Sequence, residues 1–203
     1  MPQGEVLDAA VIRAGLGKQR LGNRIVVLEE TTSTNDAVAQ MAAESEEGLV
    51  VIAEHQTAGR GQYGRRWESA ARKGLWLSLL MRPKIAVAES GRITDLLVRA
   101  IAASLEEQFG ISSSIKPPND VYAAGRKIAG VLVEMRVEAS GSYCAIGGMG
   151  LNVNHALEDF PAELRDSATS VAIITGRTVD RGAIAIALLR QLDRRYQRFH
   201  MTL

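Results

Sequence analysis

The amino-acid sequence predicts an α+β fold, in which a mixed, largely antiparallel sheet is flanked by helices. Strand-like segments follow one another with a hairpin-length connection, most clearly residues 128–137 and 143–153. Residues 89–109 and 180–198 instead carry apolar side chains at helical spacing. Strands that adjoin strands beside long helices differ from the strand–helix alternation of a parallel α/β fold, so the α+β class is favoured.

The individual elements follow from local pattern. The expected strands are residues 24–29, 49–53, 75–81, 113–116, 128–137 and 143–153. The expected helices are residues 33–43, 89–109, 170–175 and 180–198. Ser33 or Thr34 is a preferred N-cap for the first helix, and Gly110 suits the residue just after the second. The strand at 24–29 is β-branched and is expected to be buried.

The first 23 residues are expected to form an amphipathic helical lead-in, separate from a main domain at 24–203. Its expected apolar positions are Val6, Ala9, Ala10, Ile12 and Ala14.

Composition excludes several classes of protein. The chain has 203 residues with 24 Lys and Arg against 23 Asp and Glu, a net charge of +1, so charge alone gives no attraction to nucleic acid. Its one cysteine, Cys144, cannot form an internal disulfide and has no partners at zinc-site spacing. The sequence shows no signal peptide and no apolar run that would span a bilayer. We therefore expect a cytoplasmic protein without a membrane partner.

The most informative motif is Gly-Arg-Gly-Gln-Tyr-Gly-Arg-Arg-Trp at residues 59–67. Its glycines allow close backbone approach to a ligand. Arg60, Arg65 and Arg66 offer donor forks that suit phosphates and carboxylates, and Trp67 offers a surface on which a purine can stack. The motif indicates a phosphate-bearing ligand, with a solvated basic turn as the alternative. It is not a P-loop, because no Gly-Lys-Ser/Thr follows.

A second motif is Lys116-Pro117-Pro118-Asn119-Asp120, followed by Lys127 and Gly130. A lysine beside an Asn-Asp pair can place a cation on a phosphate and a carboxylate on Mg²⁺. Lys127 lies just ahead of Gly130, which leaves space for a flat ligand. The alternatives are an ordinary Pro-Asn-Asp turn and a solvated lysine at a strand edge.

Two weaker motifs complete the set. Asn152 and Asn154 follow a glycine-rich run and, two residues apart on a strand, should share a face, where amides suit an adenine edge or a ribose hydroxyl. The hydroxyls and amide of residues 32–35 stand at an expected helix start, where plain N-capping is the alternative.

Together and in this order, the four motifs resemble those of the biotin protein ligase family, over residues from about 24 to the last helix and including Ala168-Thr169-Ser170. The resemblance implies a fold related to class II aminoacyl-tRNA synthetases. It implies that biotin and MgATP give biotinyl-5′-AMP, and that a lysine of a biotin carboxyl carrier protein or domain then takes the biotinyl group.

The resemblance also implies roles for single residues. Those matching the biotin site are Ser33, Thr34, Asn35, Gln56, Gly59, Arg60, Gly61, Gln62, Lys127 and Gly130. Those matching the ATP site are Arg65, Arg66, Trp67, Lys116, Asn119, Asp120 and Asn152. Lys127, Arg60 and Lys116 would be the catalytic cations, and Asp120 would hold Mg²⁺.

The chain departs from the family pattern in four places. Gln62 stands where the loop usually has a second arginine, and Pro117 stands where a tryptophan is usual. The first 23 residues are too few for the winged helix-turn-helix domain of repressor-type members, so DNA binding is not expected. A counterpart of the family's C-terminal β-domain is not expected after the last helix, in a ligase that is either naturally minimal or truncated. The oligomeric state, monomer or homodimer, is left open.

Two alternative functions remain. One is a lipoate or octanoate ligase or transferase on the same fold. The Gly-Arg-Gly loop disfavours this alternative, because a lipoate ligase would not share that loop. The other is a non-catalytic biotin-binding paralogue, which the changes at Gln62 and Pro117 would suit.

Overall fold

We describe residues 6–139 and 141–201 of a computed structural model. One seven-stranded sheet forms its centre, in the order β1-β2-β3-β7-β6-β5-β4. The strands are β1 (Arg24–Thr31), β2 (Leu49–Gln56), β3 (Gly74–Met81), β4 (Ser113–Lys116), β5 (Asp120–Ala123), β6 (Arg126–Val137) and β7 (Tyr143–Asn152). β1 and β2 are parallel and the other neighbouring pairs are antiparallel, so the predicted mixed, largely antiparallel sheet is confirmed.

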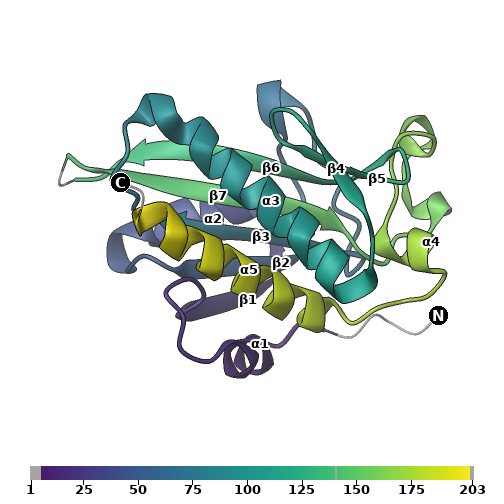
Figure 1. Ribbon diagram of the computed structural model, residues 1–203, viewed down its shortest axis with the longest axis horizontal. Helices are drawn as coiled ribbons and strands as arrows, with labels where there is room; N and C mark the ends of the chain where they lie inside the picture. The colour runs from purple at the N-terminus through teal and green to yellow at the C-terminus, as the bar shows by residue number, and fades with distance from the viewer. Residues whose placement is uncertain (1–5, 140, 202–203) are drawn as a thin grey trace.

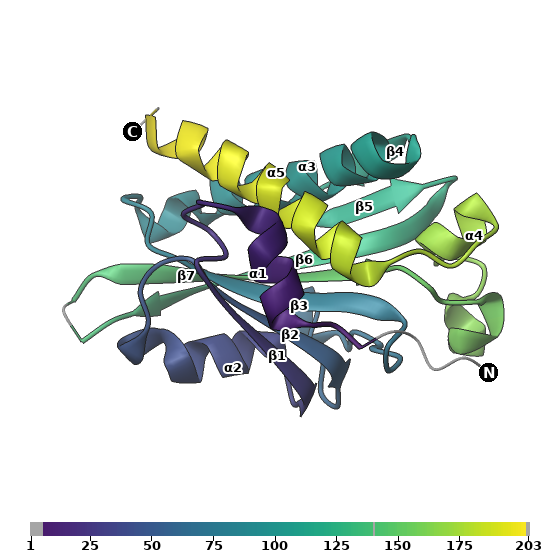
Figure 2. The ribbon, with the colours of Figure 1, turned by 90° about the horizontal axis from the view of Figure 1, so that it is seen from below.

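The helices cover both faces of the sheet (Figures 1 and 2). They are α1 (Ala9–Leu16), α2 (Thr34–Met41), α3 (Ser90–Phe109), α4 (Val171–Thr175) and α5 (Arg181–Met201). The long helices α3 and α5 lie over one face, and α2 lies on the other. Among the described residues, no helix is long and apolar enough to cross a membrane.

The alternation of side chains in β2 divides the core into two layers. Val50 and Ile52 belong to the large cluster beneath α3 and α5, whereas Leu49 and Val51 belong to the smaller cluster beneath α2. All eight residues of β3 are buried, because helices cover both faces at the centre of the sheet. The sheet is therefore a rigid platform for side chains on the α2 face.

Most of the expected elements are confirmed within one to three residues. The helix expected at 89–109 is α3, and Gly110 follows it in a left-handed conformation with φ of 64°. The hairpin expected at 128–137 and 143–153 is β6–β7, whose connecting residue 140 lies outside the described residues.

One expectation about the elements is wrong, one strand was missed, and the lead-in is confirmed in part. β1 is an edge strand in which no residue is fully buried. β5 was not predicted, because its four residues directly follow a Pro-Pro-Asn sequence that is typical of a turn. The helical lead-in is confirmed in part: α1 lies within it and Ile12 is buried as expected, but Leu7 and Leu16 are buried too and Val6 is exposed. Residues 1–5 lie outside the described residues.

A buried carboxylate joins three distant segments. Glu54 of β2 lies 2.6 Å from the Arg181 guanidinium at the start of α5, and its other oxygen accepts a 2.7 Å hydrogen bond from the backbone N–H of Leu7. The ion pair and the hydrogen bond fix β2 at Glu54, two residues before Gln56, which lines a cavity.

Candidate active site

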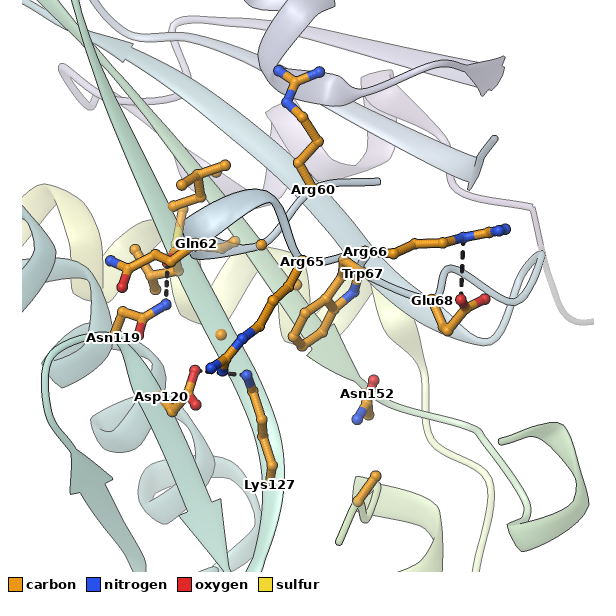
Figure 3. Close-up of a pocket in the computed structure, with 18 of the residues that line it drawn as sticks. Arg60, Gln62, Arg65, Arg66, Trp67, Glu68, Asn119, Asp120, Lys127 and Asn152 are labelled. Atoms are coloured by element: carbon orange, nitrogen blue, oxygen red, sulfur yellow. Dashed lines mark hydrogen bonds and ion pairs between the residues drawn. The ribbon is translucent and has the colours of Figure 1, made fainter. Parts of the chain in front are cut away.

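A cavity of about 590 Å³ opens on the α2 face of the sheet (Figure 3). Four segments far apart in the sequence contribute to its lining: residues 33–35, 60–68, 116–120 and 148–152. These segments belong to the four motifs singled out in the sequence, and the fold brings them together, although Gly59 and Asn154 are not among the residues that line the cavity. Lys127 and Gly130 of β6 and Gln56 of β2 line the same cavity.

Glycines on β6 and β7 make room above the sheet. A Cβ atom on Gly130 would lie 2.8 Å from the Trp67 ring, and one on Gly150 would lie 2.5 Å from it. Such distances are too short for a side chain, so both positions require glycine while the indole lies there. The flat group over Gly130 in this structure is therefore the indole of Trp67 itself.

The floor of the cavity is a connected set of buried polar groups. The Thr34 backbone N–H and hydroxyl both donate to Gln56 Oε1, at 2.9 and 3.1 Å. Ser78 Oγ lies 2.7 Å from Thr34 Oγ1 and 2.6 Å from Asn35 Oδ1. Gln56 Nε2 donates to Ser69 Oγ at 3.0 Å. These partners fix the side chains, so that the floor presents hydroxyl and amide groups in set directions.

Ser33 belongs to the same floor. It is the N-cap of α2 and is 4% exposed, yet its side chain makes no capping hydrogen bond. Simple N-capping therefore does not account for its hydroxyl, which lines the cavity.

Residues 59–67 form a small hairpin over the cavity. Gly61 N donates to Arg65 O at 2.7 Å, and Trp67 N donates to Gly59 O at 2.9 Å. Tyr63 occupies the turn with φ of 59° and is 85% exposed. Backbone hydrogen bonds therefore define the shape of this glycine-rich segment.

Lys127 is held at the centre of the cavity by both its backbone and its side chain. Its backbone N–H donates to Ser167 O at 2.8 Å, and its carbonyl accepts from Thr169 N at 2.9 Å. Its Nζ lies 2.7 Å from Asp120 Oδ1 and 5.2 Å from the centre of the Trp67 ring. The ammonium group is thus positioned between a carboxylate and an aromatic face.

Three other cations of the motifs have partners of their own. Arg60 points away from Lys127 and Asp120 (Figure 3) and pairs with Asp36 at 2.6 Å. Arg66 pairs with Glu68 at 3.1 Å. Lys116 Nζ lies 5.2 Å from the centre of the Tyr122 ring.

The side chains of the asparagines mainly form hydrogen bonds to the backbone of other segments. Asn152 Nδ2 donates to Thr169 O, and Asn119 Nδ2 donates to Val131 O. Asn154 Nδ2 donates to Val179 O, and Val179 N donates to Asn154 Oδ1. β7 ends at Asn152, so the expectation that Asn152 and Asn154 share one face of a strand is wrong.

Several residues of the site were not identified from the sequence. Ser78 had a signal, because it is the only polar residue in an otherwise apolar strand. Asp36, Ser69, Glu134, Phe160 and Ser167 had none, since their partners are distant in sequence.

An aromatic stack supports the wall of the cavity. Phe160 lines the cavity and stacks on His155 with ring centres 4.9 Å apart, and His155 meets Trp76 edge-on at 5.7 Å. Burial lowers the pKa of His155 to about 4, so the imidazole is neutral at pH 7.

The described residues contain no group of three or more His, Cys, Asp or Glu side chains arranged to hold a metal ion. Asp120 offers a single carboxylate, and proteins often hold Mg²⁺ with one or two carboxylates together with substrate phosphates. The donor set therefore fits Mg²⁺ that arrives with a nucleotide.

Comparisons with known proteins agree with this geometry. The profile of the biotin/lipoate A/B protein ligase family matches residues 27–154. The bifunctional ligase/repressor BirA of Bacillus subtilis is 36% identical over 192 residues, which are 94% of this chain and 59% of that protein. The biotin--[acetyl-CoA-carboxylase] ligase of Mycobacterium tuberculosis is 36% identical over 191 residues, which are 91% of this chain and 67% of that protein.

The fold matches as well. The biotin protein ligase of Aquifex aeolicus, solved in complex with biotin and ATP, superimposes with a TM-score of 0.77 at 31% identity, over 88% of this chain and 72% of that one. This chain spans about 59% of the length of the Bacillus relative. From the matched motifs, the shared fold and the identity over nearly its whole length, the chain belongs to the biotin/lipoate A/B protein ligase family.

Proposed function

We propose that this cavity binds biotin and ATP, forms biotinyl-5′-AMP and passes the biotinyl group to a lysine of a biotin carboxyl carrier protein or domain. The observation that carries the proposal is the presence, in one cavity, of a buried hydroxyl-amide floor and a positioned lysine beneath an arginine-bearing hairpin. The similarity to the biotin--[acetyl-CoA-carboxylase] ligase of Mycobacterium tuberculosis and to the biotin protein ligase of Aquifex aeolicus supports it.

The floor suits the head group of biotin. A cyclic urea offers two N–H donors and one carbonyl acceptor, and Ser33, Thr34, Asn35 and Gln56 offer both kinds of partner. Lipoate and octanoate carry no such group at this end. They would cover the floor without adding hydrogen bonds to it, whereas each hydrogen bond that biotin adds contributes about 0.5–1.5 kcal/mol. The floor therefore favours biotin over the lipoate alternative.

The first step joins two anions. A carboxylate oxygen of biotin attacks the α-phosphorus of ATP, and the bond to pyrophosphate breaks. Lys127 is the side chain best placed to stabilise the charge that develops, because its backbone is fixed on two sides. In this proposal its ammonium group exchanges Asp120 for a phosphate oxygen. Mg²⁺, held by Asp120 and the phosphates, would neutralise further charge.

The second step is acyl transfer. The neutral amine of the acceptor lysine attacks the carbonyl carbon of the adenylate, and AMP leaves with the bonding electron pair. We assign Arg60 with Gly59, Gly61 and Gln62 to covering the intermediate. We assign Arg65, Arg66, Trp67, Lys116, Asn119 and Asn152 to the nucleotide.

Trp67 supports this assignment of the nucleotide. Its Nε1 is buried without a hydrogen-bond partner among the described residues, and the indole lines the cavity. An unpaired buried donor is costly unless a ligand accepts a hydrogen bond from it.

We place the reaction in the cytoplasm, in keeping with the buried free thiol of Cys144.

The direct test is transfer of label. The purified chain is incubated with labelled biotin, MgATP and a biotin carrier domain, and both adenylate and labelled acceptor are measured. We expect both products, loss of both without ATP, and loss of acceptor labelling alone when the acceptor lysine is replaced by arginine. Labelling with lipoic acid but not biotin would assign the lipoate function instead. Retention of biotin with neither product would assign a binding protein.

A further inference from the structure

The Arg60 guanidinium is bound by carboxylates rather than exposed to the cavity centre. Its Nη1 lies 2.6 Å from Asp36 Oδ2 and its Nη2 lies 2.7 Å from Asp36 Oδ1, a bidentate pair. Glu134 Oε1 lies 3.6 Å from the same Nη2. The hydrogen bond from Arg60 holds the pKa of Asp36 below its usual range, so the pair is fully charged at neutral pH.

These carboxylates connect the hairpin to the floor of the cavity. Asp36 lies in the first turn of α2, directly after Asn35 of the floor. Glu134 of β6 accepts a 2.9 Å hydrogen bond from Asn35 Nδ2. Arg60 consequently joins the hairpin to the same helix start that forms the floor.

Arg60 lines the cavity, but its guanidinium is occupied by carboxylates. In Figure 3 its side chain points away from Lys127 and Asp120. A phosphate and a carboxylate present similar pairs of oxygens to a guanidinium fork, so they compete for the same donors. Arg60 cannot give Nη1 and Nη2 to Asp36 and to a ligand at the same time.

We propose that Asp36 and Glu134 are positioning residues that hold Arg60, and with it the hairpin, away from the phosphate until an anionic ligand displaces them. The identity of that ligand, an adenylate, rests on the proposed function. Arg60 would then release the two carboxylates and bind the anionic ligand instead, and the hairpin would close. The carboxylates thereby lower the affinity for the ligand and couple closure of the hairpin to its arrival.

The expected effect on ligand affinity is modest because the side chains of Arg60 and Asp36 are each about a third exposed. Ion pairs of this kind contribute ~0.2–1 kcal/mol, which corresponds to about 1.4- to 5-fold in affinity. If the pair exists only in the free protein, its removal should raise the affinity for the ligand by that factor.

The test uses the full chain, the variant Asp36→Asn and two stable analogues of biotinyl-AMP. One analogue keeps a negatively charged phosphodiester, and in the other an uncharged linker replaces the phosphate. We expect Asp36→Asn to bind the charged analogue about 1.4- to 5-fold more tightly and the uncharged one equally well. The gain should vanish in an Arg60→Ala background.

Asp95→Asn is the matched control. Asp95 of α3 pairs with Arg99, whose Nε lies 2.8 Å from each carboxylate oxygen, outside the residues that line the cavity. Its removal should leave both affinities unchanged. Weaker or unchanged binding of the charged analogue by Asp36→Asn would overturn the proposal, as would a gain that persists without Arg60.

A second measurement needs no ligand. Trypsin should cleave the free Asp36→Asn protein faster than wild type at Arg60, Arg65 and Arg66, while Asp95→Asn is cleaved at the wild-type rate. Glu134→Gln should show the same acceleration as Asp36→Asn, but smaller. Equal cleavage of all forms would overturn the role in holding the hairpin. Wild-type protein that binds neither analogue overturns the proposed function instead, and the cleavage rates still decide whether the carboxylates hold Arg60.

Discussion

The Lys127 ammonium and the Asp120 carboxylate form an ion pair at 2.7 Å within the cavity, between strands that are neighbours in the sheet. The pair gives Lys127 a fixed direction and leaves it close to the face of Trp67. A cation that is already positioned loses little entropy when it stabilises charge in a transition state.

Replacement of Lys127 by alanine should therefore abolish most adenylate synthesis. Loss of one such group typically costs about 10²–10³ in rate. Biotin should still bind, though more weakly, because the hydroxyl-amide floor is intact. The rate of adenylate formation and the Kd for biotin measure the two effects separately. Lys84→Ala, at an exposed position away from the cavity, is the control, and near-normal turnover by Lys127→Ala would remove Lys127 from the chemistry.

The hairpin at 59–67 should become protected when biotinyl-AMP is bound. Its three arginines are reachable by trypsin, and ligand contacts would add to the few backbone hydrogen bonds that define it. Limited proteolysis at Arg60, Arg65 and Arg66 measures this with and without biotin plus ATP. Cleavage at Arg136, near the tip of the β6–β7 hairpin, serves as the internal reference. Equal cleavage of the arginine-bearing hairpin in both conditions would contradict closure.

Gln62 should let the intermediate dissociate faster than an arginine would. It is half-buried in the turn of the hairpin and lines the cavity. A charge-assisted hydrogen bond contributes ~1.5–3 kcal/mol, or about 10- to 150-fold in off-rate. Because Gln62 is only half-buried, we expect Gln62→Arg to slow release of pre-formed biotinyl-AMP by about 10-fold. Val11→Arg adds the same charge at an exposed position of α1 outside the cavity lining and should have little effect. An unchanged off-rate in Gln62→Arg would show that other groups hold the intermediate.

His155 should make the protein less stable in mild acid. Its pKa is about 4 in the folded protein and 6.5 as an unperturbed imidazole, so the unfolded chain binds the extra proton between these values. Stability from this group is full above pH 6.5 and falls as the pH drops toward 4, by about 3 kcal/mol in total.

Urea unfolding at pH 7 and pH 4.5 measures this loss. His155→Phe, which can keep the stack between Trp76 and Phe160, should remove most of the difference between the two pH values. His55→Gln, at a partly exposed position on β2, should retain it. The same loss in His155→Phe as in wild type would assign the acid sensitivity to other groups.

Local sequence patterns predicted the helices and strands that are marked by their own apolar spacing or by the turn residues beside them. The apolar period and the following Gly110 predicted α3, and apolar segments separated by a short turn predicted the β6–β7 hairpin. β5 and the edge position of β1 could not be obtained in this way. β5 is four residues long, and whether a β-branched strand is central or at an edge depends on which strands pair with it.

The cavity was predictable in its motifs but not in its contacts. Residues 59–67 and Lys127 were identified because glycines, arginines and a lysine at those positions have few purely structural uses together. Asp36 as the partner of Arg60, and Ser167 as the backbone partner of Lys127, lie 24 and 40 residues away from them in sequence. No periodicity or turn chemistry links residues at such separations, so only the fold reveals these pairs.

The most direct measurement of the central claim is biotin-dependent exchange between labelled pyrophosphate and ATP, with the purified chain and no acceptor present. Adenylation is reversible, so an active enzyme incorporates label into ATP only when biotin is bound. We predict exchange with biotin and Mg²⁺, none with lipoic acid, and about 10²–10³-fold less in Lys127→Ala. Exchange that is absent with biotin, or equal in Lys127→Ala and wild type, would contradict it.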